Sequence, residues 1–199
     1  SDNNTVRNQL KGVRELGDVL YSELIDSQKI TLSDPEVDGL IYEIQALAME
    51  LEQSPEYTNA FKQKSIGAPE SAIHIHSTAH VAPDFAKTRV YVPGGINAVG
   101  IMRNALKEGV HVDYAKLWVP ETGSHEQYFR KDTPIFEVTT YAQLESITAT
   151  LRKLAGEGKI PKGPTPLAGH ELNDLPGVYI GQTEPGESFN KRIKQNIYQ

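Results

Sequence analysis

The segment Val112-Asp113-Tyr114-Ala115-Lys116-Leu117-Trp118-Val119 is the clearest strand signal in the chain, and Pro120 closes it. Side chains on a strand point alternately to the two faces of a sheet. Lys116 therefore shares a face with Tyr114 and with Trp118, the only tryptophan of the chain. We expect this lysine either to be partly shielded from water or to lie on an edge strand with its amine extended into solvent. The pattern favours the two interpretations equally.

The sequence around this segment alternates between strand and helix patterns. Further strands are predicted at 72–76, 89–92, 133–140 and 178–180. Helices are predicted at 96–106 and 141–154, and the polar stretch 120–132 is predicted to be a loop.

The first 60 residues have helical periodicity instead. Apolar residues recur every three or four positions from Val6 to Leu24, which predicts one amphipathic helix. A second helix is predicted to begin with Ser33 or Asp34 as N-cap and Pro35 at its first position, and a short third one follows Ser54. The predicted fold class is α+β, with a helical cap or docking subdomain over residues 1–66. An α+β domain with a mixed sheet and packed helices follows over residues 67–199.

Composition excludes several classes of protein. With 199 residues, 38% of them apolar and 23% charged, the chain has the make-up of an ordinary globular protein. It contains no cysteine, so disulfides and thiolate metal sites are excluded. No apolar run approaches the roughly 18 residues of a membrane helix, so no membrane partner is predicted.

The net charge of -6 is unevenly distributed. Residues 1–60 hold 4 Lys and Arg against 12 Asp and Glu, a balance of -8, whereas residues 61–199 hold 16 against 14, a balance of +2. An acidic chain binds nucleic acid poorly, because that affinity comes from neutralising many phosphates. We therefore predict no nucleic-acid partner, although a few cations directed at one phosphate group remain compatible with this charge.

The basic residues of the second part of the chain flank the predicted strands. They are Lys87 and Arg89 before one strand, Lys116 on a second, Arg130 and Lys131 before a third, and Lys191-Arg192 after a loop near the C-terminus. If these strands are neighbours in one sheet, the cations converge on one place, as a phosphate site requires. Each of them alone is as readily explained as a solvated surface residue, so the prediction depends on their occurrence together.

Two histidines share a face of the predicted strand 72–76. His74 and His76 form an HxH pattern, and His80 and Asp84 follow as further possible ligands of a zinc ion. The simpler interpretation is a half-exposed sheet face with hydrogen-bonded histidines. We therefore predict no metal and no other cofactor.

From Lys87 to about Lys194 the chain resembles the lyase module of a family of bacterial type III effectors. Related modules act beside kinase-like proteins in lanthipeptide and thioamitide biosynthesis. The matching motifs are Arg89-Val90-Tyr91-Val92, the strand with Lys116, Tyr128-Phe129-Arg130-Lys131-Asp132, Leu175-Pro176-Gly177-Val178 and Glu184-Pro185-Gly186-Glu187-Ser188-Phe189 with Arg192. More distantly, Ile73-His74, the basic strand and Asp113 to Lys116 are similar to phosphothreonine lyase effectors that inactivate host MAP kinases.

This resemblance implies β-elimination of phosphate from phosphoserine or phosphothreonine, which leaves a dehydroamino acid. Lys116 matches the position of the family's base. The pKa of free lysine is ~10.4, so a base that works near neutral pH needs its pKa lowered by ~3 units, about 4 kcal/mol. Arg89, Arg130 and Arg192 are expected to bind the phosphate through forked hydrogen bonds, and Lys131 to add a point charge.

The proton donor departs from the pattern of the family. Where the kinase-inactivating lyases have a histidine, this chain has Tyr91, which is a weaker acid at neutral pH. His76 or His74 on the neighbouring strand could replace it, and Tyr114 stands where those lyases have a lysine before the base. The predicted catalytic set is Lys116, Tyr91 and His76.

The predicted partner is a phosphorylated peptide or protein. It is a host signalling protein if the chain is an effector secreted into a host. It is a phosphorylated precursor peptide, with a kinase-like partner protein, if the chain acts in the cytoplasm in a biosynthetic pathway. Two other functions remain open from the sequence: binding of a phosphopeptide without turnover, and a metal-dependent hydrolase built on the histidines.

Overall fold

The computed structural model describes residues 4–9, 29–57, 72–120, 127–161, 170–172 and 174–182. Residues 4–9 are helical. The further elements are β1 (Lys29–Thr31), α2 (Asp34–Glu52), β2 (Ala72–His76), β3 (Thr88–Tyr91), the 3-10 helix η1 (Gly95–Asn97), α3 (Ala98–Lys107), β4 (Tyr114–Trp118), β5 (Tyr128–Arg130), β6 (Ile135–Val138), α4 (Tyr141–Gly156), β7 (His170–Leu172) and β8 (Leu175–Gln182).

Six strands form one antiparallel sheet in the order β2-β4-β6-β3-β8-β7. The strands that carry Arg89 and Lys116 are therefore separated only by β6. A second sheet consists of β1 and β5 alone. The predicted α+β class is confirmed.

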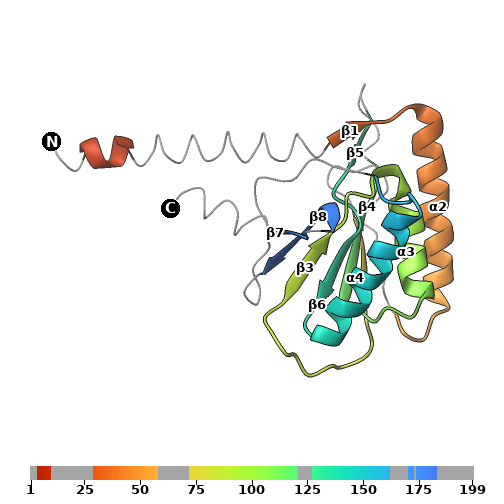
Figure 1. Cartoon of the computed structure of the whole chain (residues 1–199). Coiled ribbons are helices and arrows are strands. Elements are labelled where there is room, and N and C mark those ends of the chain that lie inside the picture. The colour runs from red at the N-terminus through yellow and green to blue at the C-terminus, as the bar shows by residue number, and fades with distance from the viewer. Residues whose placement is uncertain are drawn as a thin grey trace.

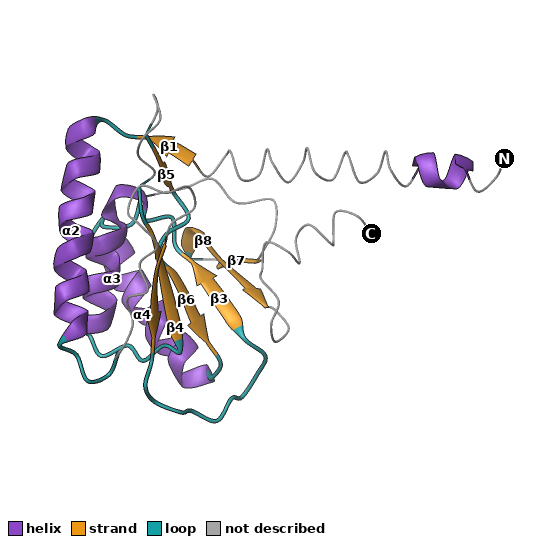
Figure 2. Cartoon of the chain, turned by 180° about the vertical axis from the view of Figure 1, so that it is seen from behind, coloured by secondary structure: helices purple, strands orange, loops and turns teal. Residues whose placement is uncertain are grey.

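Helices α2, α3 and α4 lie on one face of the six-stranded sheet (Figures 1 and 2). That face is apolar, and the core between the two layers includes Ile75 of β2, Leu117 of β4 and Phe136 of β6. Their neighbours along each strand, such as Lys116, point to the opposite face because side chains alternate. None of the described helices covers this opposite face.

The two longest helices begin at capping boxes, in which an N-cap side chain and the N3 side chain satisfy each other's backbone N–H. Ser33 and Glu36 form the box of α2, and Thr140 and Gln143 form that of α4. The buried face of α2 has Leu40 and Ile44 at its centre, and it belongs to the same core as the sheet. The boundary proposed at residue 66 lies outside the described residues.

Several elements of the structure differ from the predicted ones in extent or were not predicted. The stretch predicted as a loop at 120–132 contains β5, and β1 and β7 were not predicted. Arg130 therefore lies in the two-stranded sheet rather than at the head of β6. Val6 is helical but half-exposed, and most of the helix predicted to Leu24 lies outside the described residues.

Candidate active site

The uncovered face of the large sheet arranges the predicted site residues in two adjacent rows. One row runs across the strands through Arg89, Glu137, Tyr114 and His76. The other runs through Tyr179, Tyr91, Ile135, Lys116 and His74. Cross-strand partners project to the same side of a sheet with their Cβ atoms about 5 Å apart. We call this set of nine residues the site face.

Trp118 lies two residues after Lys116, at the end of β4. Its indole ring contacts two cationic side chains. Lys116 Nζ lies 3.8 Å from the ring centroid, and the guanidinium carbon of Arg130 lies 4.5 Å from it. Both contacts are within the range of cation–π attraction. The indole is 7% exposed, and its Nε1 has no hydrogen-bond acceptor among the described residues. Arg130 of β5 and Lys116 of β4 therefore contact the same indole ring.

Asp132 fixes the guanidinium of Arg130. Its two carboxylate oxygens accept hydrogen bonds of 2.8 Å from Nε and 2.7 Å from Nη2 of Arg130. Burial raises the pKa of Asp132, and the positive charges of Arg130 and Lys116 act against that rise. A forked pair of this kind is rigid, so Arg130 has only Nη1 outside its bidentate contact with Asp132.

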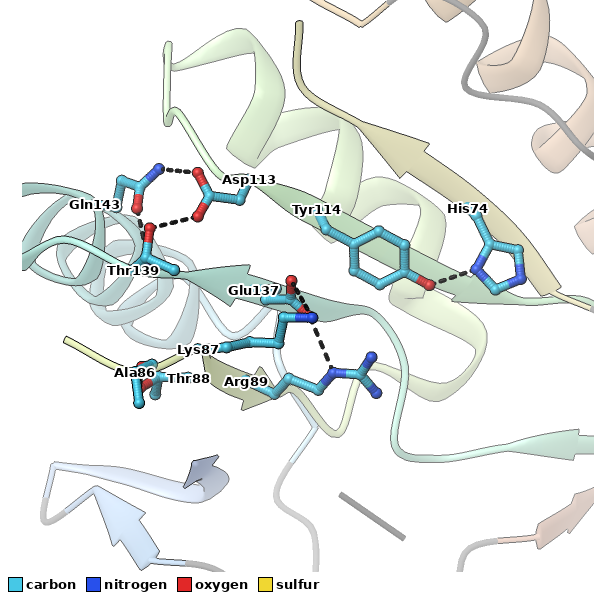
Figure 3. Close-up of polar contacts among 10 residues, drawn as sticks. All are labelled: His74, Ala86, Lys87, Thr88, Arg89, Asp113, Tyr114, Glu137, Thr139 and Gln143. Carbon is cyan, nitrogen blue, oxygen red and sulfur yellow. Dashed lines mark hydrogen bonds and ion pairs between the residues drawn. The ribbon is translucent and has the colours of Figure 1, made fainter. Parts of the chain in front are cut away.

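Glu137 pairs with two cations, Arg89 of β3 and Lys87 just before that strand (Figure 3). Its carboxylate accepts a 3.2 Å hydrogen bond from Nε of Arg89 and lies 3.5 Å from Nζ of Lys87. The Glu137 side chain is 8% exposed and that of Arg89 18%. Because Glu137 engages only Nε, the two terminal nitrogens of Arg89 are directed away from it, towards the rest of the site face.

Tyr91 and Tyr179 stack on each other, with ring centroids 4.7 Å apart and nearly parallel planes. Burial raises the pKa of Tyr91, although the positive charge of Arg89 and its hydrogen bond to the tyrosine act against this. Burial likewise raises the pKa of Tyr179. Both phenols are thus weaker acids than a free tyrosine, so the chemistry of Tyr91 favours a role in holding Arg89 over a role as proton donor.

Tyr114 joins the two rows of the site face. Its Oη is hydrogen-bonded to Nδ1 of His74, and its ring lies 5.0 Å from that of His76. The guanidinium of Arg89 lies 5.7 Å from the Tyr114 centroid. Burial raises the pKa of Tyr114 to about 12, and Arg89 acts against the rise. The tyrosine is consequently a neutral phenol at any physiological pH.

The structure thus brings Lys116 and Arg130 to one indole ring. It puts Arg89, Tyr91 and His76 on the same side of the sheet as Lys116, where His76 is exposed. Lys131 lines a neighbouring pocket instead, and Arg192 lies outside the described residues. Glu137 and Asp132 were not predicted as site residues. The sequence held a signal for each of them. Glu137 is the single carboxylate in the apolar strand Ile135-Phe136-Glu137-Val138, and Asp132 follows Arg130 by two residues.

A pocket of about 400 Å³ adjoins the site face at Tyr179, and Asp132 also lines it. Its walls are mainly apolar and come from β1, the turn before η1 and β8. The lining residues are Ile30, Thr31, Leu32, Glu36, Pro93, Gly94, Gly95, Ile96, Lys131, Asp132, Pro161, Gly177 and Tyr179. Its volume is that of a small-ligand or side-chain site.

Within the described ranges, no three His, Asp or Glu side chains are grouped to hold a metal ion. Asp84, one of the predicted ligands, accepts a 3.0 Å hydrogen bond from the backbone N–H of Tyr141 at the start of α4. His74 contacts Tyr114. The described residues therefore give the metal-site alternative no geometric support.

No protein-family model matches the sequence, and no curated protein matches it either. The structure does match solved structures of other proteins. An effector protein from Pseudomonas syringae pv. syringae strain 61 superposes with a TM-score of 0.61 at 15% identity, covering 95% of this chain and 84% of that one. An effector from Pseudomonas syringae pv. tomato strain DC3000 gives 0.61 at 13% identity, covering 97% and 85%.

The chain has the fold of these effector proteins. The predicted resemblance to effectors is thereby confirmed at the level of the fold, and identities this low carry no further conclusion. A phosphothreonine lyase also aligns, with a TM-score of 0.44, 10% identity and coverage of 95% and 98%, and this value is too low to support an argument. None of the described helices combines the length and the apolar composition that a bilayer crossing requires.

Proposed function

We propose that this chain removes phosphate by β-elimination from phosphoserine or phosphothreonine in a peptide or protein, leaving a dehydroamino acid. The observation that supports it best is that Lys116 and Arg89 lie on one sheet face that no described helix covers, and that Arg130 reaches the same Trp118 ring as Lys116 from the small sheet. The reaction needs a base for the Cα proton and donors for a leaving dianion, and these are the chemical groups that this face provides.

Lys116 is the base in this proposal. A neutral amine is the form that accepts the Cα proton, and a guanidinium close by favours that form. Arg130 shares the Trp118 ring with Lys116 and is such a neighbour. The indole beneath the amine favours the protonated form, so it stabilises the ammonium that the reaction produces and opposes the lowering of the lysine pKa.

Arg89 is the main phosphate ligand in this proposal. Glu137 engages its Nε, and Tyr91 hydrogen-bonds the same guanidinium. The terminal nitrogens are directed towards the site face, and in this proposal their N–H groups bind the phosphate there. Arg130, with Nε and Nη2 engaged by Asp132, contributes the N–H groups of Nη1 and its charge. Arg192 and Lys131 remain proposed ligands from the sequence alone.

The effector fold favours a phosphorylated host protein as substrate, with secretion into a host as the place of action. In the biosynthetic alternative, a kinase-like partner would supply a phosphorylated precursor peptide. Both substrates present the same phosphoresidue to the site face.

Mass spectrometry of phosphoserine and phosphothreonine peptides incubated with the pure protein tests the proposal. We expect loss of phosphoric acid with the wild type and with Lys107→Ala, an exposed lysine at the end of α3, but not with Lys116→Ala. Restoration of the plain hydroxyl would instead indicate a phosphatase. An unchanged mass with tight peptide binding would indicate a binding module, and either outcome would overturn the lyase proposal.

A further inference from the structure

We propose that the apolar pocket beside Tyr179 binds an aliphatic side chain of the substrate, three or four residues away from the phosphorylated one. This inference rests on the proposed function and deepens it, because it assigns a second recognition element of the same peptide. It comes from the position of the pocket at the end of the site face, from the chemistry of its walls and from its volume of about 400 Å³.

The pocket continues the site face along two neighbouring strands. Tyr179 of β8 stacks on Tyr91 of β3 and also lines the pocket. Gly177 and Pro93, each two residues from this stacked pair, line it as well. Residues two apart on a strand lie on the same face of a sheet. A peptide that lies on the site face therefore reaches the pocket directly.

The walls offer apolar surface that a ligand can cover. Ile30 and Leu32 of β1 form one side, and Ile96 of η1 lies opposite the strand residues. Ile96 is 46% exposed, and Ile30 is half-buried. Removal of such surface from water is favourable and needs no particular direction of approach. The volume of the pocket exceeds that of any aliphatic side chain, so a leucine fits without displacement of the walls.

The charged side chains of the pocket select neither sign of ligand. Glu36 and Lys131 carry opposite charges, and Glu36 Oε1 accepts hydrogen bonds from the backbone N–H and the hydroxyl of Ser33. Asp132 holds Arg130 through both of its carboxylate oxygens. A neutral occupant leaves these pairs intact, so the pocket favours an aliphatic side chain over a phosphate or a carboxylate.

The register of the sheet gives the distance from the base to the pocket. Consecutive cross-strand partners on β4, β6, β3 and β8 are Lys116, Ile135, Tyr91 and Tyr179. Neighbouring strands lie about 4.8 Å apart, so the three steps from Lys116 to Tyr179 span about 14 Å. An extended peptide covers about 3.4 Å per residue, so the third or fourth residue from the phosphorylated one reaches the pocket.

A leucine scan tests the inference. Each peptide has one phosphoserine in an alanine background and one leucine, which is moved through every position on both sides of the phosphoserine. We expect kcat/KM of the wild type to be about tenfold to a hundredfold higher with leucine three or four residues away on one side than with alanine throughout. Leucine binds equally before and during the reaction, so the gain should appear in KM and leave kcat nearly unchanged.

Two variants connect the gain to the pocket. Ile96→Glu puts a charge into the pocket at an exposed position, so the ratio of kcat/KM for the best leucine peptide to that for the alanine peptide should fall close to one. Because both rates come from the same variant, any loss of folded protein cancels in this ratio. Met49→Glu is the matched control, at a 66% exposed residue of α2 on the helical side of the sheet, and should keep the wild-type ratio.

Equal kcat/KM for all leucine positions would overturn the proposal, as would a leucine preference that Ile96→Glu leaves intact. A gain confined to the residues next to the phosphoserine would place the contact outside the pocket and overturn it too. So would light scattering that finds a wild-type dimer and an Ile96→Glu monomer, because a second copy of the chain would then fill the pocket. A wild type that eliminates phosphate from none of the peptides would instead reject the proposed function.

Discussion

Glu137 is the residue whose charge most directly opposes a phosphate ligand on the site face. It lies between Arg89 and Lys87 and is almost buried. We predict that Glu137→Gln, which keeps an oxygen for Arg89 Nε, binds phosphopeptide several-fold more tightly because a nearby negative charge is gone. The same change should lower the free energy of unfolding by about 2 kcal/mol, since two cations lose their counter-charge.

Peptide titration and urea unfolding check this prediction, with Glu145→Gln on the exposed side of α4 as the matched control. Weaker phosphopeptide binding by Glu137→Gln at unchanged stability would contradict it. That result would mean that the charge of Glu137, and not only its oxygen, holds Arg89 in place for the ligand.

At the same scale, part of the site could be predicted from the sequence. Alternation along one strand sufficed to place Lys116 beside Trp118 and Tyr114, because the period of a strand is local. The contact of Arg130 with Trp118 could not be predicted. It depends on how β5, in a separate sheet, approaches β4, and no local pattern encodes that.

The turn between β3 and α3 packs at Gly94 against the segment that joins β5 to β6, and the Gly94 N–H donates a 2.9 Å hydrogen bond to the Thr133 carbonyl. A Cβ on Gly94 would lie 2.4 Å from the backbone oxygen of Thr133 and 3.0 Å from the Cα of Ala98. Gly94→Ala should therefore cost about 2 kcal/mol or more of unfolding free energy, because backbone atoms must move. Gly100→Ala in α3 has no atom within 4 Å of its new Cβ and should stabilise by up to about 1 kcal/mol.

Urea unfolding of the two variants decides this prediction. Equal stabilities would show that the turn adapts without cost and that Thr133 does not constrain the start of η1 and α3.

The elements themselves were predictable where their signals are local. Ser33 with Glu36 forms the capping box that begins α2, and the alternating strands β2, β3 and β4 were found within a few residues. The strands β1, β5 and β7 have three residues each and no room for a period, so only their partners define them.

The whole molecule should lose stability in alkali because its buried tyrosines resist ionisation. Burial raises the pKa of Tyr57 and of Tyr114 to about 12, and it also raises those of Tyr91 and Tyr179. A folded pKa above the unfolded value near ~10 gives stability that is present below that pH and is lost as pH rises towards the folded value. The free energy of unfolding should therefore fall steadily above about pH 9.

Urea titrations across this range test that slope, with Tyr57→Phe as the informative variant. In Tyr57→Phe the free energy of unfolding should fall less steeply with pH than in the wild type. Tyr42→Phe, which alters a 73% exposed side chain, should leave the slope unchanged. Identical slopes in all three proteins would contradict the burial argument for Tyr57.

The central claim is that Lys116 removes the Cα proton of a phosphorylated residue. A phosphoserine peptide deuterated at Cα tests it most directly, by the rate of reaction and the isotope content of the product. We predict a slower reaction than with the protiated peptide and a dehydroalanine product that has lost both the phosphate and the Cα deuterium, with no product from Lys116→Ala. A product that has lost phosphate but retains deuterium at Cα would contradict the account.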